Sequence, residues 1–78
     1  MAKLSKEKSR PIAEYAYYIQ RAAEYETALY EAVRAKNDYA RKHCITNAKW
    51  AAKEAILAAN RIGLHEDYVP DFVLNRAQ

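Results

Sequence analysis

Glycine, proline and cysteine are almost missing from this 78-residue chain, which has one Gly, two Pro and one Cys. A β-rich domain of this length would need many more turn-forming residues, so the composition predicts an all-α fold. A single cysteine excludes an internal disulfide bond and is typical of a reducing compartment. Because so small a core stabilises a domain only weakly, we expect regular helix packing or a second subunit to contribute.

Long apolar runs are missing as well. No stretch approaches the roughly 20 consecutive apolar residues that a transmembrane helix needs. The first ten residues, MAKLSKEKSR, are charged and lack the apolar segment of a signal peptide. We expect residues 1–10 to form a flexible basic tail and residues 11–78 a single helical domain. We also expect the protein to be cytoplasmic and not to bind a membrane.

Metal and catalytic groupings are also scarce. The sequence has neither a Cys-x-x-Cys nor a His-x-x-x-His spacing, and His65 with its acidic neighbours is typical of a solvated turn. His43 and Cys44 point about 100° apart on a helix, so they do not form a catalytic pair, and Cys44 is expected to be a small apolar core residue. We expect no cofactor, no metal and no enzymatic activity.

Two long helices fill the span from Pro11 to Gly63, because no Gly or Pro interrupts it. Pro11 suits the first position of a helix and Gly63 the residue after one. The sequence has two weak points between them, residues 36–38 and residues 44–47. The second combines β-branched residues with N-cap types, so we place the turn there and predict helices over residues 11–44 and 47–62.

A short helical arm is predicted to follow Pro70. The expected fold is therefore a long helical hairpin with a C-terminal arm. Because a hairpin alone buries little surface, two copies could pair as a four-helix bundle in a homodimer.

Five of the seven tyrosines fall within residues 14–32. At about 100° per residue, the apolar side chains of the first helix form one stripe, consisting of Ile12, Tyr15, Ile19, Ala22, Leu29, Val33, Ala40 and Cys44. Tyr18 and Tyr25 border this stripe, whereas Tyr17 points nearly opposite it and Tyr39 lies well off its centre. The pattern fits a helix seam edged by phenols whose hydroxyls stay in water, or a tyrosine-rich binding face.

Glu26 interrupts the apolar stripe near its centre. An unpaired carboxylate in a dry seam would cost several kcal/mol. Glu26 must therefore be exposed at an edge, paired with a base, or hydrogen-bonded by tyrosine hydroxyls. A paired Glu26 could also fix the register of a partner.

The second helix has two unlike faces. One is broad and smooth, and we expect it to pack on the first helix; it consists of Ala48, Ala51, Ala52, Ala55, Ala58, Ala59 and Ile62. Trp50 and Leu57 lie on the opposite side, and burying both would contribute about 5 kcal/mol. The C-terminal arm, a second copy, or another protein or nucleic acid could cover them.

Basic residues collect between Arg34 and Lys53, and residues 34–61 carry seven bases against two acids. Bases interleaved with aromatic rings can grip a phosphate backbone and stack on unpaired nucleobases. The other interpretation is a solvated helix end whose cations complement the helix dipole. A helix-turn-helix DNA reader does not fit, because such modules use short helices.

These features favour a non-catalytic protein-binding module, a small regulator or inhibitor that occupies the surface of another protein. A phage- or mobile-element-encoded antagonist of a host complex would have this profile, although no residue specifies it. The alternative is a nucleic-acid-binding accessory protein that uses the basic end. The predicted contact residues are Tyr17, Tyr18, Tyr25, Tyr39, Arg41, Lys42, Trp50 and Lys53, with the rings as anchors and the cations steering encounter.

Overall fold

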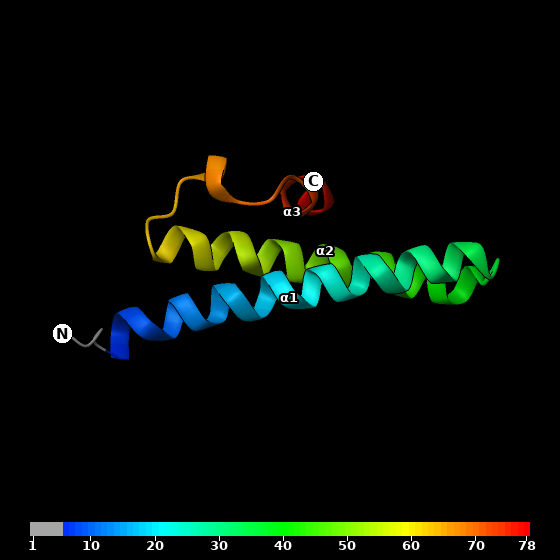
Figure 1. The fold of residues 1–78 in the computed structure, drawn as a ribbon, viewed down its shortest axis with the longest axis horizontal. Helices are drawn as coiled ribbons and strands as arrows, with labels where there is room; N and C mark the ends of the chain where they lie inside the picture. The colour runs from blue at the N-terminus through cyan, green and yellow to red at the C-terminus, as the bar shows by residue number, and fades with distance from the viewer. Residues whose placement is uncertain (1–5) are drawn as a thin grey trace.

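A computed structural model describes residues 6–78, which contain helices and no strand. Helix α1 (Lys6–Arg34) and helix α2 (Asp38–Arg61) lie antiparallel and form a long hairpin. A 3₁₀ turn (Glu66–Tyr68) and helix α3 (Asp71–Ala77) follow, and they return along α2 (Figure 1). The predicted all-α hairpin with a short C-terminal arm is confirmed.

The turn of the hairpin lies at residues 35–37, so its predicted position at residues 44–47 is wrong. Lys36 adopts a left-handed conformation (φ 54°), and the N–H of Asn37 donates to the carbonyl of Ala32 at 3.0 Å. Glycine usually occupies this position at a helix end, and a lysine there conceals the signal. Asn37 then caps α2, because its Oδ1 accepts a hydrogen bond from the N–H of Ala40 at 3.1 Å.

Residues 44–47, where the turn was predicted, are part of the continuous helix α2. The Thr46 hydroxyl donates to the carbonyl of Lys42 at 3.1 Å, so its polar group is satisfied inside the helix. Ala48 in the next turn is buried. Hydrogen bonding and packing therefore outweigh the preference of Thr46 for a helix cap.

The beginning of α1 also differs from the prediction. The helix starts at Lys6, which places Pro11 inside it rather than at its first position. Residues 1–5 of the predicted tail lie outside the described residues, and residues 6–10 are helical. The flexibility of this segment stays a prediction.

The core consists of small side chains from α2 packed on α1 and on the arm. Its α2 members are the predicted alanines, all buried: Ala48, Ala51, Ala52, Ala55, Ala58 and Ala59. Ala22 contributes from α1, and Val69 and Val73 contribute from the arm. Because alanine occupies so little space, α2 can approach both neighbours closely, and it lies between α1 and α3 (Figure 1).

Gly63 reverses the chain from α2 into the arm, as predicted. Its backbone is left-handed (φ 70°), and the N–H of Leu64 donates to the carbonyl of Ala59 at 2.9 Å. Leu64 then packs against the core. This arrangement satisfies the α2 carbonyls and starts the arm back along the helix that it follows.

Glu26 is paired with a base of its own chain. Two nitrogens of Arg76 in α3 donate to its carboxylate oxygens, Nε to Oε1 at 2.6 Å and Nη2 to Oε2 at 3.0 Å. The hydrogen bond with Glu26 raises the pKa of the Arg76 guanidinium above its usual value. The pair therefore ties α1 to α3, and the carboxylate inside the stripe holds the arm.

Candidate functional site

Three predicted contact residues meet on one side of the hairpin. The Tyr17 and Tyr18 rings are 5.1 Å apart, and the Tyr18 and Trp50 rings are 5.4 Å apart, both pairs edge to face. The prediction that Trp50 points away from the first helix is therefore wrong. Its indole is long enough to reach back across the seam to Tyr18 of α1.

Leu57 extends this cluster along α2. It lies two helical turns after Trp50, so both side chains project on the same side of the helix. Tyr17, Trp50 and Leu57 are 54%, 47% and 48% exposed. We call Tyr17, Tyr18, Trp50 and Leu57 the aromatic face.

The arm does not cover the aromatic face. It binds the flank of α1 that carries Glu26, whereas Tyr18 and Glu14 lie on the other flank of the same helix. Those two residues contact Trp50 and Arg61 of α2, with 2.8 Å between the Glu14 carboxylate and the Arg61 guanidinium. The prediction that the arm folds back is confirmed, but the idea that it covers Trp50 and Leu57 is wrong.

Tyr25 is held by an arginine that sequence reasoning missed. The Arg21 guanidinium donates to the Tyr25 hydroxyl at 2.9 Å and also lies 5.1 Å from the centre of the Tyr25 ring. This hydrogen bond raises the pKa of Arg21 above its usual value. Arg21 also binds Glu24 at 2.9 Å. The spacing of three and four residues on a helix was the available signal.

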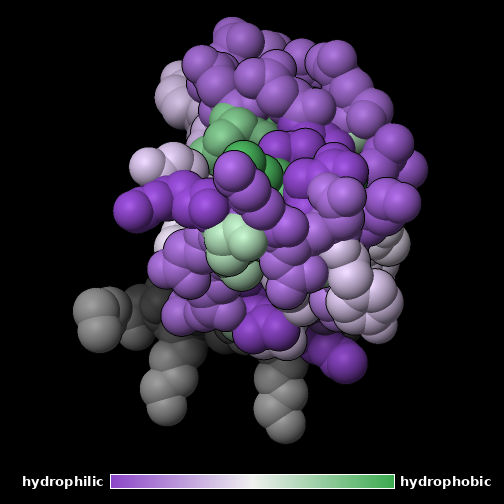
Figure 2. Space-filling view, turned by 90° about the vertical axis from the view of Figure 1, so that its right-hand side faces the viewer, coloured by the Kyte–Doolittle hydropathy of each residue, from purple (hydrophilic) through white to green (hydrophobic). Residues whose placement is uncertain are grey.

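The other predicted residues lie apart from the aromatic face. Tyr39 is 82% exposed near the turn, and its ring is parallel to that of His43 at 6.3 Å. Arg41 pairs with Asp38 at 3.5 Å, and Lys42 is exposed. Figure 2 looks onto this end of the hairpin and shows mostly hydrophilic side chains around a small apolar patch.

Lys53 is the exception among the predicted bases. It is exposed and lies three residues after Trp50 and four before Leu57, so its side chain borders the aromatic face. The structure therefore divides the eight predicted residues. Tyr17, Tyr18, Trp50 and Lys53 belong to one surface, with Tyr25 on the same flank of α1 as Tyr18, whereas the remaining three lie near the turn.

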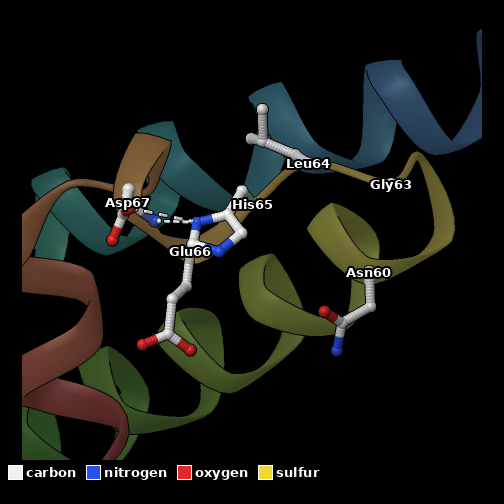
Figure 3. Close-up of a pocket in the computed structure, with 6 residues that line it drawn as sticks. All are labelled: Asn60, Gly63, Leu64, His65, Glu66 and Asp67. Carbon is white, nitrogen blue, oxygen red and sulfur yellow. Dashed lines mark hydrogen bonds and ion pairs between the residues drawn. The ribbon is translucent and has the colours of Figure 1, made fainter.

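A hollow of about 580 Å³ lies where α2 passes into the arm (Figure 3), lined by Asn60, Gly63, Leu64, His65, Glu66 and Asp67. His65 Nδ1 accepts a hydrogen bond from the N–H of Asp67 at 3.1 Å, which caps the 3₁₀ turn. Among the side chains that the structure describes, no three His, Cys, Asp or Glu residues gather as metal ligands would. His65 therefore helps to order the turn.

Comparison of the chain with protein-family models, curated proteins and solved structures found no match. No helix within residues 6–78 combines the length and the apolar character needed to span a membrane. The function has to be inferred from the chain's own surfaces, and the aromatic face is the most distinctive of them.

Proposed function

We propose that this protein is a non-catalytic binding module, a small regulator or inhibitor that occupies the surface of a partner protein. The observation that carries the proposal is the aromatic face, where Trp50, Tyr17 and Leu57 remain about half exposed. Tryptophan and tyrosine are the side chains most enriched at the energetic centres of protein interfaces. Antagonists encoded by phages or mobile elements are one class of protein that works in this way.

The face has the size of the apolar centre of an interface, since a standard interface buries about 800 Å² per partner. The exposed halves of Tyr17, Trp50 and Leu57 amount to roughly 300 Å² of largely apolar surface, whose burial would contribute about 7 kcal/mol before the costs of association. Tyr18 contacts both Tyr17 and Trp50 edge to face. This contact already positions the Tyr17 and Trp50 rings, so these two side chains would lose less conformational entropy when a partner binds.

Co-purification from the cells that make the protein tests the proposal. We expect a partner protein to be retained by the tagged wild type and lost at least tenfold from the double variant Trp50→Ala/Leu57→Ala. Tyr68→Ala is the matched control, because Tyr68 is an exposed ring on the arm. A partner retained equally by all three proteins, or no partner retained above the untagged background, would contradict the proposal.

Nucleic-acid binding is a second candidate, favoured by the exposed lysines of α2. Lys42, Lys49 and Lys53 are exposed, with Tyr39 and Trp50 interleaved among them. If they contact phosphates, affinity should fall steeply between about 50 mM and 200 mM salt. A gel-shift titration with single- and double-stranded DNA and RNA checks this, and no retardation at low salt would exclude this function.

A further inference from the structure

We infer that the partner presents an acidic amphipathic segment, with an apolar strip that docks on the aromatic face and carboxylates that meet a line of lysines on α2. The lysine line consists of Lys42, Lys49 and Lys53. This inference rests on the proposed function and specifies the chemistry of the partner.

The arginines and lysines of the described residues differ in what they contact. Five of the six arginines form ion pairs with carboxylates, namely Arg10, Arg21, Arg41, Arg61 and Arg76. Arg34, the sixth, lies over the Tyr30 ring at 5.8 Å. In the part of the chain that the structure describes, the lysine line has no ion pair. Of the four lysines whose side chains the structure describes, three therefore lie exposed on α2, and the fourth, Lys36, lies in the turn.

The position of the lysine line links it to the aromatic face. Lys53 lies between Trp50 and Leu57 on the helix surface, and Lys49 and Lys42 continue the line toward the turn. The line is about 16 Å long at the rise of an α-helix. A partner segment of about three helical turns could follow both the lysines and the apolar side chains.

Charge also sets the orientation of the partner segment. Glu54 lies between Trp50 and Leu57 as well, four residues after the first and three before the second, and it is half-buried on the side toward α1. The ridge formed by Trp50 and Leu57 therefore has a positive outer edge and a negative inner edge. Carboxylates on one flank of an amphipathic segment would be attracted to the outer edge and repelled by the inner edge.

The same surface fits a protein better than a nucleic acid. Arginine is the side chain that grips phosphates in a bidentate manner, and five of the six arginines here already bind carboxylates of their own chain. Leu57 offers an apolar contact that a phosphate backbone does not use.

Two designed peptides probe this surface directly. Each has 18 residues without tryptophan, with leucines spaced to form one helical face. One peptide carries glutamate along one flank of that face, and its twin carries lysine at the same positions. Binding at low salt is measured by anisotropy of the labelled peptide and by emission of Trp50, the chain's only tryptophan. We expect the glutamate peptide to bind at least tenfold tighter than the lysine peptide and to shift the Trp50 emission.

Two single charge reversals supply the matched comparison. Lys53→Glu and Lys36→Glu change the net charge equally, but Lys36 lies in the turn at the end of the hairpin. We expect Lys53→Glu to weaken binding of the glutamate peptide at least fivefold and Lys36→Glu to change it less than twofold. A twelve-residue oligothymidylate serves as the nucleic-acid probe and is expected to bind more weakly than the glutamate peptide.

Each opposite outcome overturns the inference in a distinct way. Equal binding of both peptides, lost in Trp50→Ala, would refute the preference for acid while leaving protein binding intact. Tighter binding of the oligothymidylate, weakened by Lys53→Glu, would assign the lysine line to nucleic acid. No Trp50 shift with either peptide at 100 μM would reject the inference outright, while co-purification decides the proposed function independently.

Discussion

On the arm side of the hairpin, Val69 and Val73 are buried against the alanines of α2, whereas on the opposite side Trp50 and Leu57 stay half-exposed. The two sides belong to the same pair of helices. The arm supplies an ion pair, Arg76 with Glu26, only on the side that it covers. The chain therefore completes one face of its hairpin and leaves large apolar side chains half-exposed on the other.

Side-chain size explains why the arm chooses its side. Alanines leave a smooth surface on which the small branched side chains of Val69 and Val73 pack closely. The surface of a helix that carries its largest apolar side chains is therefore not necessarily the one that its own chain covers.

Removing the arm is the most severe test of this difference. A chain ending at Gly63 loses the burial of Val69 and Val73, worth about 4 kcal/mol together, and the Glu26–Arg76 pair as well. A domain of this size is marginally stable, so we expect most of its cooperative unfolding to disappear. Circular dichroism during heating checks this, with a chain lacking only Gln78 as the control. A sigmoidal transition within a few degrees of the full chain would show that the arm is dispensable.

Single side-chain substitutions compare the two sides of the hairpin in more detail. Val73→Ala should lower the free energy of unfolding by about 2 kcal/mol, because Val73 is fully buried and its methyl groups leave a cavity. Leu57→Ala should cost less than about 1 kcal/mol, since half of that side chain already faces water. Urea denaturation of both variants measures this. Equal losses would mean that Leu57 is buried in solution, for example by a second copy.

Two ion pairs, one on each side, provide the next comparison. Glu26→Gln should destabilise the fold by about 1–2 kcal/mol, because it weakens two hydrogen bonds to a partly buried guanidinium. Glu24→Gln should change stability by less than about 0.5 kcal/mol, since its bridge with Arg21 is exposed. Urea titrations at neutral pH measure both effects. A larger loss from Glu24→Gln would reverse the assignment of the two sides.

The smallest effect concerns Tyr15, which packs against the covered core. Burial raises the pKa of its hydroxyl above the usual value of about 10. The folded state therefore holds this proton at pH values where the unfolded chain releases it, so stability should fall as pH rises from about 10 through the folded pKa. Tyr15→Phe should reduce this slope, and thermal melts between pH 8 and 11 measure it. An unchanged slope would show that Tyr15 is not the group responsible.

Most of the fold was predictable, because helix content and the alanine face follow from local composition and period. Gly63 also gave a correct end for α2, since glycine adopts the left-handed conformation there at no cost. The turn was missed because Lys36 adopts that conformation without being glycine. Propensity placed the break at residues 44–47, where packing keeps the chain helical.

The candidate site was predicted only in part. The sequence placed Tyr17 and Trp50 facing outward and Tyr18 at the border of the apolar stripe, but their contact across the seam could not be predicted from one helix at a time. Leu57 was placed opposite the alanine face with a cover expected from the arm or a partner, and it became a member of the aromatic face only when the arm was found on the other side. Its proximity to Lys53 on the helix, by contrast, follows from spacing alone.

The sequence by itself determined that this protein is helical, that α2 has an alanine face and that Trp50 and Leu57 are left over on its other side. These properties depend on residues within a few positions of one another. The tertiary structure alone decided which face the arm covers, that Arg76 satisfies Glu26 and that Trp50 rests on Tyr18. Those contacts join residues up to 50 positions apart, and they form only where packing brings distant side chains within reach.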